Sequence, residues 1–387
     1  MRKLTGLLLL CFAVLLGGCT SDSVNQGTFQ HDDNPIIQAT DNATAETTEP
    51  NDPNRIYKKV REDFLIDADI VDFPSNDGVK VFEAIPKHLS QEEINKFLTA
   101  KGDTATEWEM ITCTGTTAHG GEFQLRHGVA LTSSTLYYKN TMHRRWGDCS
   151  IYYGQRGDDD VPNHTYAYLF TEPKDFSFAT AEEAEEEVRD ILRTHMGLED
   201  LLLNRTLYID HKILANELTT ILQDEEVQAM DKTGHIPVYY DWSEADDGYI
   251  FEFFPTVDGA PMFYPNMVTD TMAYLGSSVQ VWYQESGIVY LSIDSSMWSI
   301  GNVVETASTP LSPQDAMSIA QVRLENTMAY SETEVYKVSG EYIHVQDRNR
   351  ILLRPVWVVY AKSTSSYSGN IYTQYVVIDA ITGDEIM

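Results

Sequence analysis

The sequence predicts an α+β fold of antiparallel sheets, each with packed helices. Two amphipathic helices with clear N-terminal caps begin at Thr180 and Ser312, and each precedes a series of short strands with an alternating pattern. The caps lie 132 residues apart. We therefore expect a helix–meander unit, meaning a helix followed by an antiparallel meander, to be used twice. Mixed helix and strand signals before Thr180 predict an additional N-terminal α+β part.

The chain of 387 residues is long for a single hydrophobic core, so it is expected to divide into segments. Composition and capping signals suggest their boundaries. The expected segments are a leader at 1–18, a polar tether at 19–54, an N-terminal α+β domain at 55–178, a helix–meander module at 179–306 and a second module at 307–387.

The leader has the features of an export signal. Arg2 and Lys3 precede an apolar run at 7–16, which is shorter than the about 20 residues that span a bilayer. Leu16-Gly17-Gly18-Cys19 resembles the lipobox of bacterial lipoproteins. This resemblance implies that the Cys19 sulfur carries lipid and anchors the protein on the extracytoplasmic face of the cell membrane. An ordinary leader followed by a chance cysteine is the alternative.

The composition of the tether predicts disorder, and the net charge of the chain limits which partners it can bind. Residues 20–54 are rich in Ser, Thr, Asn, Asp and Pro and have no apolar period, which is typical of a disordered segment. The formal net charge of the chain is −32. Nucleic acid is excluded as a partner because its binding requires basic surface.

Two cysteines, Cys113 and Cys149, remain in the globular part. Exported proteins reside where disulfides persist, so these two are the disulfide candidates. Loop-closure entropy would give such a bridge about 4 kcal/mol. Two buried free thiols are the alternative.

The 55–178 segment mixes strands with one clear helix. Ser90 and Glu93 form a predicted capping box, and the following helix has an apolar face. Strands are expected at 79–82, 123–131, 134–138 and 165–170.

The 179–306 segment begins with the capping box Thr180–Glu183 and a helix at 181–195 that Gly197 ends. A second helical stretch is expected at 213–230. Asp258-Gly259 is a strong hairpin signal. Strands are expected at 249–254, 261–264, 279–283 and 288–293.

The last segment repeats this plan. Ser312 is the expected cap and Pro313 the first residue of the helix. Asp379 and Gly383 predict a tight turn after the last strand. Strands are expected at 334–338, 341–345, 354–361 and 372–378.

The closing segments LLRPVWVVYAK and YTQYVVIDAITGDEIM resemble the final strands of PepSY-type domains. The pair of helix–meander units is also similar to the YycH/YycI family of extracytoplasmic regulators that restrain a sensor kinase. These resemblances imply protein-binding modules without catalytic residues. Those regulators usually carry a transmembrane helix, whereas a lipid anchor is expected here, which puts direct control of a kinase in doubt. The chain is otherwise like clostridial lipoproteins of unknown function.

No motif predicts a metal or catalytic site. His119 and His127 are eight residues apart around a Gly pair, unlike the four-residue spacing of helical zinc sites. The acidic stretch 241–248 does not fit the ligand pattern of a calcium loop, and 158–160 is interpreted as a solvated loop with a calcium site as the alternative. Neither a Gly-x-Ser-x-Gly elbow nor a phosphate loop occurs. We therefore expect no catalytic residues, no metal and no cofactor.

The sequence thus favours a non-enzymatic, lipid-anchored surface protein that binds another envelope protein in a regulatory or inhibitory role. The alternative is a lipoprotein that binds a glycan or a solute. Its basis is the abundance of tyrosine and tryptophan in predicted strands, because aromatic side chains on a sheet face can stack on sugars. Neither hypothesis identifies the binding residues.

Overall fold

The protein, as a computed structural model, is mostly β. The expected fold of antiparallel sheets with packed helices is therefore wrong as a fold class. The residues that the structure describes are 52–75, 77–109, 112–129, 134–141, 170–221, 242–263, 274–275, 278–294, 298–326, 330–348, 350–367, 369 and 371–386.

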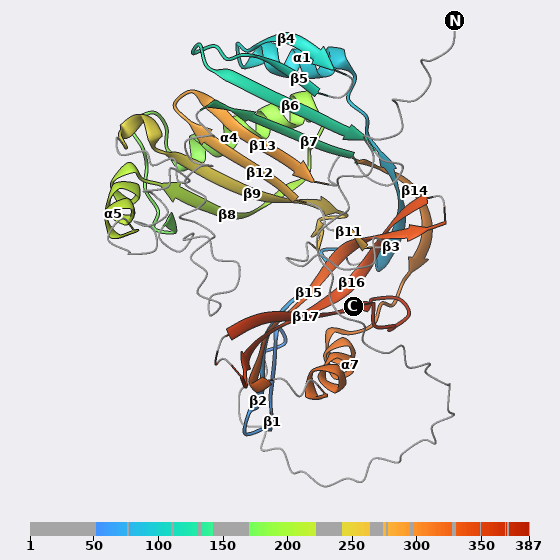
Figure 1. Cartoon of the computed structure of the whole chain (residues 1–387). Coiled ribbons are helices and arrows are strands. Elements are labelled where there is room, and N and C mark those ends of the chain that lie inside the picture. Colours follow the sequence, from blue (N-terminus) through green and yellow to red (C-terminus); the bar gives the residue numbers. More distant parts are fainter. Residues whose placement is uncertain are drawn as a thin grey trace, which may run out of the picture. The chain divides into compact units, whose positions relative to one another are not determined.

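Within these residues the strands form two large sheets (Figure 1). One, here called the terminal sheet, contains strands from both ends of the described chain. Its strands are β1 (Arg55–Arg61), β2 (Phe64–Val71), β3 (Val79–Pro86), β11 (Tyr274–Leu275), β14 (Trp298–Ala307), β15 (Tyr330–Asp347), β16 (Arg350–Ser365) and β17 (Ile371–Asp379). The strands of the other, the central sheet, are β4 (Thr104–Glu109), β5 (Thr112–Thr116), β6 (Glu122–Val129), β7 (Ser134–Asn140), β8 (Leu201–Ile209), β9 (Gly248–Val257), β10 (Ala260–Pro261), β12 (Ser278–Gln284) and β13 (Gly287–Asp294).

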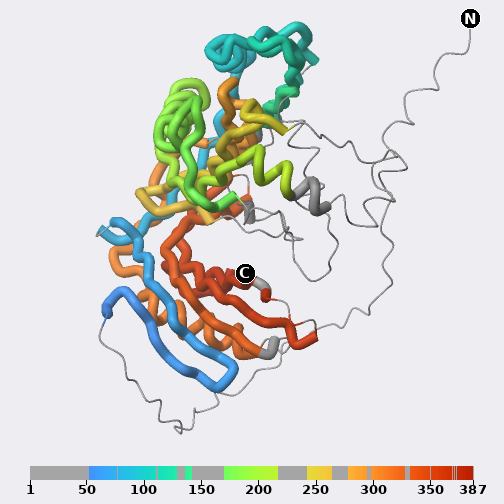
Figure 2. The backbone as a smooth tube through the Cα atoms, turned by 90° about the vertical axis from the view of Figure 1, so that its left-hand side faces the viewer, coloured from blue at the N-terminus to red at the C-terminus, as the bar shows by residue number. Residues whose placement is uncertain are grey.

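The terminal sheet joins segments that are far apart in sequence. Its described strands follow the order β1-β2-β15-β16-β3-β14, with β17 paired to β16 and β11 to β15. The pair β2–β15 is parallel, and the blue N-terminal hairpin lies beside the red C-terminal strands in Figure 2. In the central sheet the order is β10-β9-β12-β13-β7-β6-β5-β4, with β8 paired to β9.

These pairings explain why the expected repetition of a helix–meander unit is wrong. Strands β15–β17 form a meander, but β1–β3 and β14 extend the same sheet. Strands β9, β12 and β13 are likewise extended by β4–β7. A short meander leaves unpaired edges, and here β2 covers the edge at β15 while β7 and β8 cover those at β13 and β9. Such long-range pairing leaves no local signal in the sequence.

Three of the described helices begin where their capping signals predict, whereas the helix expected at 213–230 begins at His211. Those described are α1 (Gln91–Ala100), α4 (Ala181–Ile191), α5 (His211–Ile221) and α7 (Pro313–Glu325), with a π turn at Leu192–Met196 and a 3₁₀ turn at Glu244–Asp246. The capping boxes of Ser90 and Thr180 are confirmed, and Ser312 caps α7 with Pro313 in its first turn. Gly197 ends the π turn in the left-handed conformation. Among the described helices, none combines the length and apolarity needed to cross a bilayer.

Each sheet has a core beneath a helix. Helices α1 and α4 bury Phe97 and Val188 against the central-sheet side chains Phe251 and Phe253. Helix α7 buries its apolar face on the terminal sheet around Trp357. Because side chains alternate along a strand, the opposite faces carry different residues. On the central sheet that opposite face forms part of the candidate site.

One strand differs from its expected bounds for a clear steric reason. Separate strands are expected at 334–338 and 341–345, but β15 runs through both of them and through Gly340, from Tyr330 to Asp347. A Cβ on Gly340 would lie 2.9 Å from Cδ2 of Phe73. The glycine therefore makes room for a packed aromatic ring rather than for a turn.

A hairpin connects the two sheets. Asp258 and Gly259 have φ angles of 51° and 83°, which confirms the predicted turn between β9 and β10. After β10, Met262 forms a bridge with Tyr342 of β15, and the backbone N–H of Phe263 donates to the Tyr342 carbonyl at 2.7 Å. The segment that follows β10 thus links the central sheet to β15.

Candidate functional site

A cleft of about 640 Å³ lies beside this connection. Its walls come from β8, β9, β12 and β13 of the central sheet and from β15 and β16 of the terminal sheet. Small-molecule sites in proteins usually have volumes of about 300–1,000 Å³. The cleft is therefore large enough for a ligand of several rings.

The central-sheet wall carries a fixed network of planar polar groups. Strand pairing places Glu252 opposite both Arg205 and Gln280. The Arg205 guanidinium donates from Nε to Glu252 Oε2 at 2.5 Å and from Nη2 to Oε1 at 2.9 Å. The Gln280 amide donates to the same Oε1 at 3.1 Å. These hydrogen bonds hold three side chains in one orientation on the face opposite the core.

On the terminal-sheet wall, a β-bulge determines which side chains line the cleft. The register of β15 with β16 shifts between Val335 and Lys337, and its register with β2 shifts at the same place. Consecutive residues normally point to opposite faces, whereas a bulge redirects a side chain. Accordingly Tyr336 and Lys337 both line the cleft, together with Tyr360.

The aromatic rings on this wall are close together. The ring centroids of Tyr336 and Tyr360 are 6.2 Å apart at an interplanar angle of 42°. Lys337 Nζ lies 5.0 Å from the Tyr360 centroid, and Lys362 Nζ lies 5.1 Å from that of Tyr336. The half-buried tyrosines thus give the cleft an apolar surface beside its polar wall.

A buried carboxylate, Glu341, forms part of the same wall and is only 4% exposed. Its Oε1 accepts a hydrogen bond from the Tyr360 hydroxyl at 2.9 Å, and Lys337 Nζ lies 3.9 Å away. Burial raises the pKa of Glu341 above its ordinary value, although Lys337 and the hydroxyl bond oppose this effect.

We expect the raised pKa of Glu341 to make stability depend on pH. The folded state binds the Glu341 proton more tightly than the unfolded chain does, so this residue's contribution is fully present below the unfolded pKa of about 4.3. The contribution is lost as the pH rises through the folded pKa. Between about pH 4 and about pH 7 the wild type should therefore lose stability relative to Glu341→Gln, as measured by urea unfolding. A stability difference that stays constant with pH would contradict this assignment.

The charges in the cleft balance, although the chain is strongly acidic. Among the described residues that line it, Arg205 and Lys337 are basic and Glu252 and Glu341 are acidic. The whole chain has a formal net charge of −32. A local balance of this kind favours an uncharged ligand with hydrogen-bonding groups over a strongly charged one.

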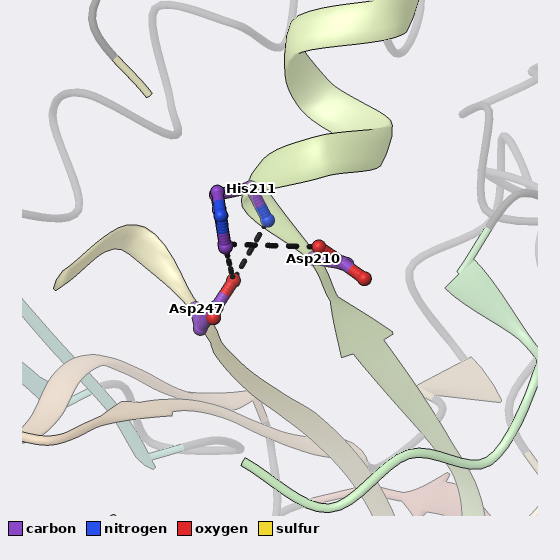
Figure 3. A group of neighbouring side chains, drawn as sticks. All are labelled: Asp210, His211 and Asp247. Carbon is purple, nitrogen blue, oxygen red and sulfur yellow. Dashed lines mark hydrogen bonds and ion pairs between the residues drawn. The ribbon is translucent and has the colours of Figure 1, made fainter. Parts of the chain in front are cut away.

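A separate group of ligating side chains lies at the start of α5 (Figure 3). The ligand atoms of Asp210, His211 and Asp247 all lie within 4.8 Å of one another, a spacing that a metal ion could bridge. His211 Nδ1 is 2.8 Å from Asp247 Oδ1 and 3.7 Å from Asp210 Oδ1. Asp247 follows the 3₁₀ turn in the acidic stretch 241–248, which lacks the ligand pattern of a calcium loop.

The bonds of this group are those of a helix N-terminus. Asp247 Oδ1 accepts the backbone N–H of His211 at 2.7 Å, and Asp210 Oδ1 accepts that of Lys212 at 2.8 Å. Lys174 also forms an ion pair with Asp210. Burial alone would raise the pKa of Asp210, but Lys174 and the Lys212 N–H outweigh it and hold that pKa below its ordinary value. Lys174 therefore already supplies a positive charge to Asp210. We assign Asp210 and Asp247 the role of capping the N-terminus of α5.

The residues singled out from the sequence lie elsewhere. Cys19 and Cys149 are outside the described residues, so the lipid anchor and the disulfide stay predictions. Cys113 is a buried thiol on β5, and burial raises its pKa to about 11. His127 is buried on β6, where its Nε2 accepts the backbone N–H of Leu89 at 3.0 Å. His119 lies in the turn before β6.

Sequence reasoning missed the residues of the cleft. Trp282 and Tyr290 are among the aromatic residues of the predicted strands, and their ring centroids lie 5.2 Å apart on β12 and β13. Neither lines the cleft. Tyr336 lies within an expected strand, but only the bulge turns it toward the cleft. An alternating pattern gives no sign of such a bulge.

Comparison with known proteins supports the fold alone. No family model matches the chain, and no curated protein matches it. Among solved structures, the chain is similar to an uncharacterized protein from Eubacterium rectale, with a TM-score of 0.58 and 20% sequence identity. The similarity covers 87% of this chain and 94% of the other. Because the similarity covers most of both chains, this arrangement of strands occurs in a second protein.

Proposed function

We propose that the protein is a non-enzymatic surface lipoprotein that binds a neutral glycan in the cleft between its two sheets. The observation that carries the proposal is the lining of the cleft. Tyr336 and Tyr360 form an aromatic surface opposite the Arg205–Glu252–Gln280 network, and the charges are balanced. The lipid anchor at Cys19 rests on the lipobox resemblance.

The chemistry of a sugar fits this lining. Each sugar hydroxyl both donates and accepts, so it can pair with guanidinium and amide donors and with carboxylate acceptors. The C–H face of a sugar ring packs on aromatic side chains such as Tyr336. An acidic sugar would meet the negative field of the whole chain. A neutral oligosaccharide satisfies all three conditions.

The bonds of the two carboxylates support binding rather than hydrolysis. A glycosidase needs one carboxyl group as a proton donor and a second as base or nucleophile. Glu252 is paired through two hydrogen bonds with Arg205, which favours its ionised form. Glu341 accepts the Tyr360 hydroxyl and lies near Lys337. Both carboxylates therefore have structural partners.

Thermal unfolding across a panel of ligands tests the proposal. We expect neutral oligosaccharides to raise the melting temperature of the full-length protein, because a ligand at 100 times its Kd stabilises by about 2.7 kcal/mol. Acidic oligosaccharides and short peptides serve as matched comparisons and should give smaller shifts. Stabilisation by acidic sugars or peptides alone would overturn the choice of ligand.

A second candidate function is the binding of another envelope protein. The observation that favours it is strand β14, which pairs only with β3 among the described strands and exposes Ile300, Val303 and Val304. An open strand edge can accept an extended segment of a partner by main-chain hydrogen bonds. The resemblance to protein-binding PepSY-type domains agrees with this candidate. If no oligosaccharide changes the melting temperature, crosslinks from β14 to one envelope protein would favour it.

A further inference from the structure

A second cavity, of about 310 Å³, lies on the helix-covered side of the central sheet. Its lining includes Lys101, which follows α1, and Glu187 of α4. Tyr283 and the turn from Glu285 to Gly287 complete it from β12 and β13. Tyr283 packs with the core on this side, whereas Gln280 of the same strand lines the cleft. The cavity and the cleft are therefore separate sites.

Lys101 is held in place at the end of α1. Its backbone N–H donates to the carbonyl groups of Phe97 and Leu98 as the helix ends. Its Nζ donates to the Ile288 carbonyl at 2.5 Å and lies 4.9 Å from the centroid of the Tyr138 ring. The amine thus has one fixed hydrogen-bond partner and an aromatic neighbour, and its side chain is only part-buried.

Burial of this amine increases the fraction of it that is neutral. Burial lowers the pKa of Lys101 to about 8, although the charges of Asp103 and Glu187 oppose the shift. His119 and Glu285 are the other titratable groups that line the cavity besides Tyr283. At about pH 7, roughly a tenth of such amines would be neutral, against well under a thousandth for an ordinary lysine.

A carboxylate and a phenol are positioned beside the amine. The Tyr283 hydroxyl donates to Glu187 Oε2 at 2.6 Å, and both side chains line the cavity. Burial raises the pKa of Tyr283, and its bond to Glu187 adds to this effect. Glu187 is therefore an acceptor that can take up a proton and return it within the cavity.

We propose that Lys101 is a covalent binding site for small, neutral carbonyl compounds. The neutral Nζ attacks the carbonyl carbon, so that a C–N bond forms and the carbonyl oxygen takes up a proton. The resulting carbinolamine loses its hydroxyl group as water and becomes an imine. Both protons of the amine leave with the oxygen, and Glu187 carries them. The volume is at the lower end of the range for small-molecule sites, and Glu187 and Glu285 disfavour an anionic ligand.

Reductive trapping on the full-length protein tests this site. The protein is treated with propionaldehyde and cyanoborohydride near neutral pH, and peptide mass spectrometry measures propylation at each lysine. Lys96 is the matched control because it lies exposed on α1, the helix that Lys101 follows, with Glu92 at 2.9 Å, an interaction that raises the pKa of Lys96. We expect Lys101 to react at least about tenfold faster than Lys96. Equal or slower labelling of Lys101 would overturn the proposal.

A variant of Glu187 tests whether this residue carries protons or only changes the reactivity of the Lys101 amine. Glu187→Gln removes a charge that raises the pKa of Lys101, so a purely electrostatic role predicts faster labelling. If Glu187 carries protons, aldehyde trapping should slow by about tenfold or more. Acetylation of Lys101 by acetic anhydride, which forms no imine, should not slow. Aldehyde trapping that is unchanged or faster in this variant would contradict the role of Glu187.

Discussion

Replacing Trp357 by alanine is expected to lower the free energy of unfolding by about 3–5 kcal/mol. The indole is 1% exposed beneath α7, and its Nε1 donates to the Leu311 carbonyl at 2.8 Å. The Phe73 ring packs against it edge-on with centroids 5.0 Å apart. The substitution opens a large cavity and leaves the Leu311 carbonyl without this donor. Urea unfolding measures the loss.

Val322→Ala provides the matched control for Trp357→Ala. Val322 lies on α7 itself but is 62% exposed. Its truncation should change the free energy of unfolding by less than about 0.5 kcal/mol. A loss below about 1 kcal/mol for Trp357→Ala would show that the terminal sheet does not depend on this contact between helix and sheet.

Asp379→Ala is expected to cost about 3–4 kcal/mol, because Asp379 combines two interactions at the end of β17. Its Oδ2 accepts hydrogen bonds from Arg354 Nε and Nη2, both at 2.8 Å. Its Oδ1 accepts the backbone N–H groups of Ile381 and Thr382 at 2.8 and 3.0 Å. Alanine removes all of these bonds, and among the described residues the guanidinium then keeps Glu305, at 3.8 Å, as its ion-pair partner.

Asp379→Asn separates the two contributions. The amide oxygen can still accept the N–H groups of Ile381 and Thr382, but the charge facing Arg354 is lost. We expect a loss about half that of Asp379→Ala in the same urea titration. Equal losses in the two variants would show that the turn contributes nothing. A loss below about 1 kcal/mol for alanine would contradict both roles.

The same turn shows what local sequence reasoning can predict. Asp379 and Gly383 indicate a tight turn, and Gly383 indeed has a φ of 77° with its N–H bonded to the Asp379 carbonyl. The caps at Ser90, Thr180 and Ser312 are confirmed for the same reason. The turn and the three caps each depend on residues within a few positions of one another, so a short stretch of sequence is enough to predict them.

The fold class could not be predicted in this way. Strand β2 pairs with β15, although Phe64 and Thr333 are far apart in sequence. Which distant strand pairs with β2 depends on how side chains pack in the folded protein rather than on strand propensity. Alternation along a strand indicates which face is apolar, but not which distant strand covers its edge.

The candidate site was hidden for a related reason. Arg205, Glu252 and Gln280 come from three strands and meet only through their registers. Tyr336 faces the cleft because one extra residue enters β15 at a bulge. Neither register nor bulge leaves a motif of the kind that marks a metal or nucleophile site. A binding cleft lined by ordinary strand residues is therefore visible only in the folded chain.

Calorimetric titration of the full-length protein with a neutral oligosaccharide is the most direct test of the glycan-binding cleft. Wild type and Tyr57→Ala, a variant of a tyrosine 43% exposed on β1, should bind equally. Tyr336→Ala should bind at least about tenfold more weakly, a loss of about 1.4 kcal/mol. Equal affinities for all three proteins, or no heat of binding with the wild type, would contradict the assignment of the cleft.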